Sequence, residues 1–443
     1  MNINFIVTAN LSDDDRKTLC IRSGVGLQEL ISQVVPIIDD VKNRGDAALS
    51  YYSLRFDGAK LFHEEFRVTQ RSIEEAIRSI APELKRAIVG SIQNIKKFHE
   101  FQKEPQTREV EITKGVVAGE RTIPLRSAGL YIPRGKGSFP SMMMMAAVPA
   151  KVAGVKRIVA VSPPDRFGKA DQATLAAAGM IGVDEFYTVG GAHAIAALAY
   201  GTETIKQVDK IVGPGSGYVL AAKQWLSSEV DTGLPAGPSE AVILADSSAE
   251  AILVATDLLI EAEHGPDSSA YLVTPDPSLA KEALDILPRL LNNLPQDRRS
   301  YCEKVLSNSG GIVLASDMDD AIRFVNEFAP EHLQIMTVNP RELLERISTA
   351  GETLLGRFTP GTLANYSIGP NAILPTSGFG RTASALSVRD FNRKMSFAEV
   401  TEEGFMAMAP NTLILADYEG FPAHAEALRY RMKLQSGALN STE

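Results

Sequence analysis

The 443-residue sequence contains very little cysteine, one tryptophan and no long apolar run. Its two cysteines, Cys20 and Cys302, are too few for a disulfide framework or a cysteine-ligated metal cluster. Neither stands beside a glycine turn or an activating base, so we interpret both as small, partly buried residues and not as thiol nucleophiles. A tightly held metal ion must therefore be bound by some of the six histidines and by carboxyl or amide oxygens.

Membrane and nucleic-acid functions are also disfavoured. The longest apolar stretch, MMMMAAVPA, is far shorter than the roughly 20 residues that a transmembrane helix needs. The amino terminus has no basic region followed by an apolar one and does not resemble a signal peptide. The formal net charge of -9 argues against a surface that binds nucleic acid. We expect a soluble, cytoplasmic protein.

The composition, with 44% hydrophobic and 22% charged residues, is that of an ordinary globular chain, and the length favours two or three domains. Residues 22–105 repeat apolar residues at three- and four-residue steps, which predicts helices. His63 and His99 lie among charged residues in this region, and we expect both on the surface.

From residue 156 onward, short β-rich segments alternate with helical ones. The predicted strands are RIVAVSPP, EFYTV, KIVGPG, AVILAD, AYLVTP and GIVLAS, and helices such as HAIAALAYG and VLAAKQWL separate them. This alternation indicates an α/β fold with largely parallel sheets and helices on both faces. A pause at DTGLPAGPSE suggests two doubly wound, Rossmann-like units that meet near residue 240, and the chain becomes helical again after residue 390.

Two glycine-rich loops follow predicted strands. VGGAHA (189–194) and VGPGSG (212–217) lie where backbone N–H groups and a helix amino terminus can receive an anion, beyond the carboxyl ends of the strands. Neither has the G-x-G-x-x-G spacing of a dinucleotide site, and tight packing turns would explain them equally well.

The segment FAPEHLQI places Glu331 and His332 after a predicted helix and a proline, directly before an apolar strand. Neighbouring side chains on a strand point in opposite directions, so a loop conformation is needed to bring both into one cleft. Such a pair could divide the tasks of holding water and removing a proton. A helix cap beside a hydrogen-bonded structural histidine would give the same residues.

Two further segments contain candidate metal ligands. In EAEHGPD, Glu261 and His264 are three residues apart and share one helix face, a spacing that can hold one metal ion, although a structural helix end has the same pattern. In EGFPAHAEAL, His424 follows Glu419 by five residues, and an ordinary packed histidine is the alternative there.

Taken together, these segments resemble the histidinol dehydrogenase family. The segments that match, in the order in which that family has them, are GLYIP, AVPAKVAGVKRIV, VGGAHAIAALAYGT, DKIVGPG, PAGPSE, AEHGPDS, FAPEHLQI and ILPT. The resemblance extends from about residue 25 to residue 430. It implies a homodimeric enzyme that binds one Zn²⁺ per subunit and NAD, and that oxidises an amino alcohol through the aldehyde to the carboxylic acid.

The resemblance also implies roles for single residues. Glu331 would activate the attacking water of the second oxidation, and His332 would act as the base. The implied zinc ligands, which also contact the substrate, are Glu261, His264, Asn365 and His424, the last contributed by the partner subunit. The other implied substrate contacts are Ser239, His332 and Glu419, and the implied cofactor contacts are Tyr131, His193 and Ser216.

These implications suggest a division of the chain. Residues 1–120 would form a helical segment that packs with the second α/β unit. Residues 121–240 would form a Rossmann-like domain with the cofactor loops, and residues 241–389 a second one with the metal and catalytic residues. Residues 390–443 would be a helical dimerisation tail.

The sequence departs from the family at several of these positions. Glu261 stands where the family usually has glutamine and Asn365 where it has aspartate, so the ligand set keeps one negative charge, as a retained divalent site requires. Ala372 replaces a usual histidine on the substrate side. His193 and Ser216 replace a usual glutamine and asparagine on the cofactor side.

Arg357, at a position that is often acidic in the family, could favour an anionic substrate or could be an ordinary surface arginine. Three hypotheses follow. The first is oxidation of L-histidinol to L-histidine, and the second is oxidation of another polar alcohol, such as sulfopropanediol, by a paralogous zinc- and NAD-dependent enzyme. The third, a non-catalytic binding protein, is disfavoured by the retention of Glu331, His332, His264 and His424.

Overall fold

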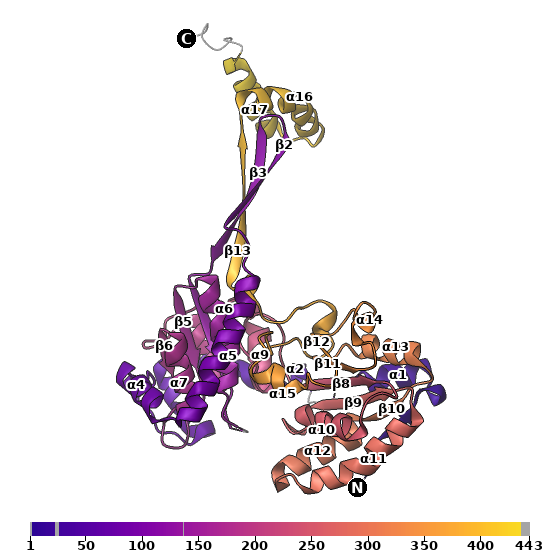
Figure 1. The fold of residues 1–443 in the computed structure, drawn as a ribbon. Coiled ribbons are helices and arrows are strands. Elements are labelled where there is room, and N and C mark those ends of the chain that lie inside the picture. Colours follow the sequence, from indigo (N-terminus) through magenta and orange to yellow (C-terminus); the bar gives the residue numbers. More distant parts are fainter. Residues whose placement is uncertain (1, 23–25, 136, 436–443) are drawn as a thin grey trace. The chain divides into compact units, whose positions relative to one another are not determined.

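The computed structural model describes residues 2–22, 26–135 and 137–435, and the chain divides into two compact units. The larger unit comprises residues 1–103 and 124–391, and the smaller unit comprises residues 104–123 and 392–443. Figure 1 labels most of the elements of both units. No helix within the described ranges is long and apolar enough to cross a membrane.

A four-stranded parallel sheet forms the first half of the larger unit. Its strands, in the order β6-β5-β4-β7, are Glu185–Tyr187, Arg157–Val161, Ser127–Tyr131 and Lys210–Val212. The linking helices are α6 (Pro140–Ala153), α7 (Gln172–Ile181), α8 (Gly191–Tyr200) and α9 (Gly217–Trp225). Leu130 and Ala160 pack with α6 and α7, whereas Tyr131 and Val161 pack with α8 and α9. Because both faces are covered, the strands are continuous apolar runs.

A six-stranded parallel sheet forms the second half. Its strands, in the order β1-β10-β9-β8-β11-β12, are Phe5–Val7, Gly310–Leu314, Ser269–Thr274, Glu240–Ala245, His332–Met336 and Glu352–Leu355. Helices of this half are α10 (Ala251–Ala262), α11 (Pro277–Asn292), α12 (Gln296–Asn308), α13 (Met318–Phe328), α14 (Pro340–Leu344) and α15 (Gly361–Tyr366). One face packs with α10, α11 and α12, and the other packs with α13. The predicted α/β fold with two parallel sheets is confirmed, and each β-rich segment quoted above is a strand.

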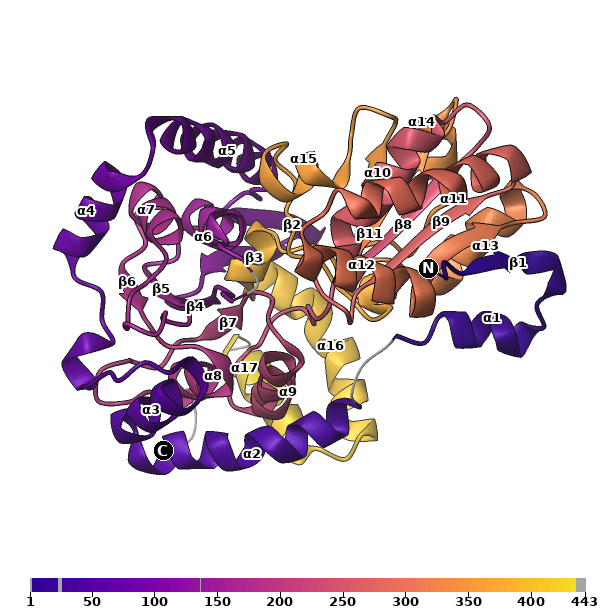
Figure 2. The same ribbon diagram turned by 90° about the horizontal axis from the view of Figure 1, so that it is seen from below.

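The helices predicted in residues 22–105 are α2 (Leu27–Arg44), α3 (Asp46–Tyr52), α4 (Gln70–Ser79) and α5 (Pro82–Phe101). The expectation that this segment packs with the second α/β unit is wrong for these helices. In Figure 2, α2 lies beside α8 and α9; α4 packs on α7, and α5 packs on α6. Strand β1 and helix α1 (Asp13–Leu19) join the six-stranded half, on β10 and α13. An apolar stripe predicts a buried helix face, but it does not specify which sheet receives that face.

The two histidines of this region differ in burial. His63 is exposed, as expected, and its Nδ1 lies 3.2 Å from Asp46 Oδ2. The expectation of a surface position is wrong for His99, which is fully buried. Its Nδ1 lies 2.8 Å from the Ile95 carbonyl oxygen, its Nε2 lies 3.2 Å from the Asn371 amide, and burial lowers its pKa. The charged neighbours that suggested exposure occupy the outer face of the same helix.

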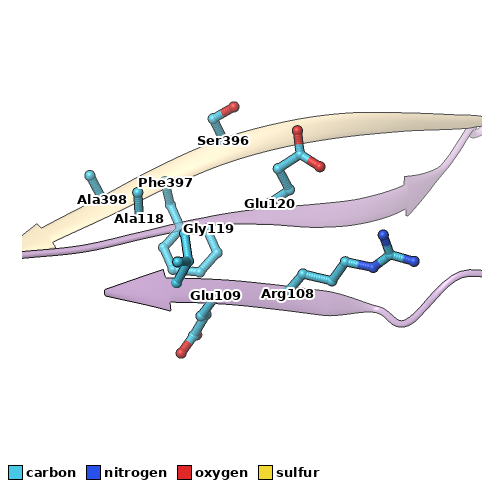
Figure 3. A pocket seen from close by; sticks show the side chains of 9 residues that line it. Arg108, Glu109, Ala118, Gly119, Glu120, Ser396, Phe397 and Ala398 are labelled. Carbon is cyan, nitrogen blue, oxygen red and sulfur yellow. The ribbon is translucent and has the colours of Figure 1, made fainter. Parts of the chain in front are cut away.

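The smaller unit contains a three-stranded sheet, ordered β13-β3-β2, and two helices. These elements are β2 (Thr107–Thr113), β3 (Val116–Pro124), β13 (Asn392–Val400), α16 (Glu402–Tyr418) and α17 (Pro422–Gln435). Strands β2 and β3 form an antiparallel hairpin with Gly115 in its turn, at a φ of 76°. Figure 3 shows Phe397 against Gly119 in a hollow of this sheet. A β-carbon on Gly119 would lie 2.4 Å from the Phe397 ring, so glycine makes room for the aromatic side chain.

These strands correct two of the expected domain boundaries. The expected helical segment ends before residue 120, because residues 107–113 and 116–124 are strands, and the tail is helical from residue 402 and not from residue 390, because residues 392–400 form a strand. Most side chains of β2 and β13 are exposed. These strands therefore lack the continuous apolar runs by which the buried parallel strands were recognised.

Asp320 links the amino-terminal strand to the helix layer of the six-stranded half. Its carboxylate accepts hydrogen bonds from Thr8 Oγ1 over 2.5 Å, from Arg16 over 2.8 Å and from the Ser316 N–H over 3.1 Å. Burial alone would raise the pKa of Asp320, but these donors outweigh burial and lower the pKa to about 2.

Asp320→Asn is expected to lower the free energy of unfolding by about 1–3 kcal/mol at pH 7, because an amide cannot replace the carboxylate toward these donors. The folded pKa of Asp320 is below the value of about 3.9 in an unfolded chain. The carboxylate therefore stabilises the fold fully above about pH 5, and this contribution is lost as the pH falls toward 2. Urea unfolding at pH 7 and pH 3 should show a smaller difference between variant and wild type at pH 3. An equal difference at both values would contradict this role.

Candidate active site

Glu331 lies in the loop between α13 and β11, and His332 is the first residue of β11. Ala329, directly after α13, has a left-handed backbone conformation with a φ of 51°, which redirects the chain toward the strand. Glu331 precedes the strand and escapes its alternation, so that Glu331 Oε1 lies 3.8 Å from His332 Nε2. Both side chains are buried. The predicted loop conformation that brings the two together is confirmed.

The pair lies at the amino edge of the six-stranded sheet, where β8, β11 and β12 begin with Glu240, His332 and Glu352. Doubly wound folds usually bind ligands at the opposite, carboxyl edge, where the strand order reverses. At the carboxyl edge between β8 and β11, the Asp246 carboxylate instead accepts a hydrogen bond from the Val338 N–H over 3.1 Å. Glu331 and His332 are therefore positioned at the opposite edge, by the loops that lead into the strands.

Three of the four expected metal ligands lie together beside this pair. Glu261 is in the last turn of α10, and His264 Nδ1, just beyond the helix, lies 3.0 Å from Glu261 Oε2. Asn365 of α15 donates from Nδ2 to Glu261 Oε1 over 2.9 Å, and His332 Nε2 lies 4.0 Å from the same oxygen. Ser239, an expected substrate contact, has its Oγ 2.9 Å from His264 Nδ1. The i, i+3 spacing thus brings Glu261 and His264 together as predicted.

The site concentrates acidic groups in a buried place. Burial lowers the pKa of His332, but the carboxylates of Glu261, Glu331 and Glu352 outweigh burial and raise that pKa to about 10. Burial, with the nearby Glu261 carboxylate, raises the pKa of Glu331 well above its ordinary value. Burial would also raise the pKa of Glu261, but the rings of His264 and His332 outweigh it and hold that pKa below the ordinary range. More carboxyl groups than cationic side chains meet here.

A divalent cation fits this environment. Glu261 Oε2 is buried and makes no well-aligned hydrogen bond in the described part of the chain, although His264 lies 3.0 Å away. A carboxylate oxygen, an imidazole nitrogen and an amide oxygen are all donors that Zn²⁺ accepts. Within residues 2–22, 26–135 and 137–435, no three His, Cys, Asp or Glu side chains form a complete metal cluster. The donors of Glu261, His264 and Asn365 are thus a fitting but incomplete set.

Arg22 and Glu240 support the Glu331 loop, and sequence reasoning missed both. Arg22 donates to the two carboxylate oxygens of Glu240 over 2.9 and 3.0 Å, and to the carbonyl oxygens of Phe328 and Ala329. The N–H of Glu240 donates to Glu331 Oε2 over 2.9 Å. Arg22 therefore holds the backbone before Glu331, and Glu240 holds the Glu331 carboxyl group. A single arginine in CIRSGVG belongs to no motif, so the sequence contains no signal for this contact.

The expected cofactor loops meet at the carboxyl edge of the four-stranded sheet. Tyr131 ends β4, and its hydroxyl oxygen accepts the N–H of Gly191 over 3.1 Å. Burial raises the pKa of Tyr131 to about 12. A β-carbon on Gly213 would lie 2.1 Å from the Tyr131 carbonyl oxygen, so the backbone passes directly beside this tyrosine. The loops 189–194 and 212–217 therefore flank Tyr131.

His193 and Ser216, the other expected cofactor contacts, have opposite surroundings. His193 is only 1% exposed, neither ring nitrogen has a hydrogen-bond partner among the described residues, and burial lowers its pKa to about 3. The rings of Tyr52 and Phe56 lie 5.8 and 6.1 Å from it, centroid to centroid. Ser216 is exposed and precedes α9 without a side-chain capping bond. The ring nitrogens of His193 and the hydroxyl group of Ser216 thus make no hydrogen bond with any described residue.

Two departures from the family pattern are packed or paired. Ala372 is buried in the apolar core beside the four-stranded sheet. Arg357 NH1 lies 2.5 Å from Glu250 Oε1, so the charge of this arginine is already balanced. The structure therefore provides no free cation at Arg357 for an anionic substrate.

Glu419 and His424, the remaining expected contacts, lie in the smaller unit. Glu419 follows the end of α16, and His424 is in the first turn of α17, with its ring 5.3 Å from that of Phe421. Both side chains are exposed.

The two thiols do not belong to the site. Cys302 is fully buried in α12, and burial raises its pKa to about 12. Cys20 is partly buried, and burial raises its pKa as well. Neither thiol has the lowered pKa of a reactive cysteine.

Comparisons with known proteins identify the family of this chain. The family model described as histidinol dehydrogenase matches residues 21–432. A histidinol dehydrogenase from Synechocystis sp. is 49% identical over 93% of this chain and 95% of its own length. A histidinol dehydrogenase homolog from Colwellia psychrerythraea is 46% identical over 95% of each chain. The crystal structure of histidinol dehydrogenase from Elizabethkingia anophelis superimposes with a TM-score of 0.91 at 35% identity, covering 98% of this chain and 99% of that one. The chain belongs to the histidinol dehydrogenase family.

Proposed function

We propose that the protein uses zinc and NAD to oxidise L-histidinol, through the aldehyde, to L-histidine. The observation that carries this proposal is the buried grouping of Glu331 and His332 with the donors of Glu261, His264 and Asn365. Family membership supports the choice of substrate, and the geometry supports an acid–base pair beside a cation site.

Glu261, His264 and Asn365 would hold the zinc ion, and His424 of the partner subunit would complete a four-ligand set. Bound zinc would supply a Lewis acid for the substrate oxygen, and bound NAD beside Tyr131 would supply the hydride acceptor for both oxidations. With these groups in place, the remaining task of the protein is to move protons at defined atoms.

His332 would take the hydroxyl proton at Nε2, because its Nδ1 faces Glu352 at 2.6 Å. A divalent cation bound at Glu261 would offset the carboxylates that raise the pKa of His332, so that the ring would be neutral at Nε2 and able to accept this proton. Glu331, whose carboxyl group is oriented by the Glu240 N–H over 2.9 Å, would take a proton from the water that attacks the aldehyde. Burial raises the pKa of Glu331, which makes its carboxylate a stronger proton acceptor than an ordinary glutamate. No described cysteine is placed to form a thioester, so the acid would arise from a hydrated aldehyde.

We also propose that the active form is a homodimer in which each subunit contributes His424 to its partner. The two-helix element of α16 and α17 exposes apolar side chains, with Ile414 at 66%, Tyr418 at 89% and Tyr430 at 53%. Exposed apolar side chains of this kind favour association with another surface.

Mixing two inactive variants tests this arrangement. His332→Ala and His424→Ala subunits are each expected to be inactive, but a mixed dimer would contain one site with neither substitution. Random subunit exchange should therefore restore about a quarter of the wild-type sites. Activity should appear only under conditions that exchange subunits, as followed by mass spectrometry of intact dimers. Exchanged dimers without activity would overturn the shared site.

The substrate is tested by NADH formation from purified protein with L-histidinol, sulfopropanediol or a simple amino alcohol, with and without added zinc. We expect the highest kcat/KM with L-histidinol, and Arg357, which is paired with Glu250, gives no support to a sulfonated substrate. A higher kcat/KM with another alcohol would overturn L-histidinol as the proposed substrate but would leave the proposed oxidation chemistry intact. Absence of NADH with every alcohol, from folded and zinc-loaded protein, would overturn the proposed function.

A further inference from the structure

The backbone fixes Glu352 beside His332. These two residues begin neighbouring parallel strands and are direct partners in the register of β11 and β12. The N–H of Glu352 donates to the Glu331 carbonyl oxygen over 3.0 Å, and the N–H of Gly351 donates to that of Pro330 over 2.9 Å. A β-carbon on Gly351 would lie 2.6 Å from the Glu331 carbonyl oxygen, so a side chain there would separate the strands. Glycine at position 351 therefore allows the segments that lead into β11 and β12 to approach this closely.

The side chains continue this pairing in a buried environment. Glu352 Oε1 lies 2.6 Å from His332 Nδ1, and the side chains are 8% and 7% exposed. A carboxylate only accepts hydrogen bonds, so this contact requires a hydrogen on Nδ1. His332 Nε2 lies 3.8 Å from Glu331 Oε1 and 4.0 Å from Glu261 Oε1, beyond hydrogen-bonding distance of both. The ring therefore presents Nε2 toward the metal donors and Glu331.

Burying Glu352 has a cost that packing alone does not justify. Its Oε2 is buried and has no hydrogen-bond partner among the described residues. An unsatisfied buried polar atom destabilises a fold, and a buried carboxylate does so more strongly than an amide or an apolar group. A side chain that only filled this space would therefore not need to be an acid. Within the described part of the chain, the hydrogen bond that the Glu352 carboxylate makes is the one with His332.

We propose that Glu352 is a positioning residue that holds the His332 ring with its hydrogen on Nδ1, so that Nε2 always faces the substrate. This inference rests on the proposed role of His332 as the base. Histidines that bind or exchange protons in enzyme sites are commonly oriented through their other nitrogen, and that second contact decides which nitrogen carries the hydrogen.

The test compares Glu352→Ala with the wild type and with the control Glu345→Gln. Glu345 is an exposed glutamate that precedes β12 in the sequence. For Glu352→Ala we expect kcat for L-histidinol to fall about 10–100-fold, the size usual for the loss of a group that orients a site histidine, with little change in KM. Added acetate or formate should restore part of the loss, because a small carboxylate can occupy the vacated space. Glu345→Gln should behave as the wild type.

A spectroscopic readout separates positioning from general stability. In zinc-loaded protein labelled with ¹⁵N-histidine, the His332 signals, assigned by their loss in His332→Gln, should show a hydrogen on Nδ1. Glu352→Ala should convert them to a mixture of tautomers. An unprotonated Nδ1 in the wild type, or an unchanged kcat in Glu352→Ala, would overturn the inference. If Glu352→Ala does not fold, the wild-type spectrum still tests the inference, through the presence or absence of a hydrogen on Nδ1 of His332. Absence of all alcohol oxidation by the wild type would instead overturn the proposed function and leave the tautomer measurement intact.

Discussion

His332→Ala is expected to lower kcat for L-histidinol by about 10²–10⁴-fold, the range in which loss of a general base falls. Its Nε2 is the atom that faces the metal donors, 4.0 Å from Glu261 Oε1, and no other described imidazole contacts Glu331. The substitution removes the proton acceptor but none of the proposed zinc ligands. Zinc content and the circular dichroism spectrum should therefore stay close to those of the wild type.

The matched control is His63→Ala, which removes an exposed imidazole from the amino-terminal helices. It should leave kcat and zinc content unchanged. Free imidazole added to His332→Ala should restore part of the rate, because it can fill the vacated space and accept the proton. Near-normal turnover of His332→Ala at saturating substrate would show that another group is the base.

The second large effect concerns the zinc ligands. Glu261 and Asn365 touch through a 2.9 Å hydrogen bond, so both can reach one ion. Glu261→Gln would leave the zinc ion without an anionic protein ligand. Loss of a residue that only supports a ligand lowers metal affinity about 10–100-fold, and we expect a larger decrease here. Adding Asn365→Asp should recover much of the affinity, since it restores one carboxylate. Such non-additivity is expected of residues that share one partner.

Zinc content and chelator competition of the wild type, both single variants and the double variant measure this coupling without reference to catalysis. Glu263→Gln is the control, because it removes an equal charge from the neighbouring turn. Full zinc retention by Glu261→Gln, or a double variant no better than the single one, would mean that Glu261 and Asn365 do not share a metal ion.

The parallel strands could be predicted because burial on both faces leaves them as short, continuous apolar runs between turn residues. RIVAVSPP and AYLVTP, for example, contain strands β5 and β9. The same criterion failed for β2 and β13, whose side chains are mostly exposed. It also gave no information about which sheet the helices α2, α4 and α5 cover, because a helical stripe does not identify its partner.

The site was predictable where its residues form local motifs. Glu261 with His264, and Glu331 with His332, are close in sequence and belong to segments that the family shares. Glu352 and Arg22 were not predictable, because their roles depend on pairing between segments that are distant in sequence. The register of β11 and β12 creates the first contact, and the turn at the end of α13 creates the second.

The most direct test of the proposed function is the number of NADH molecules formed for each L-histidinol consumed by zinc-loaded protein, with the product identified by mass spectrometry. Conversion of a primary alcohol to a carboxylic acid removes two hydrides, so we predict two NADH per L-histidinol and L-histidine as the released product. One NADH per substrate with release of the aldehyde, or no NADH at all from folded and zinc-loaded protein, would contradict it.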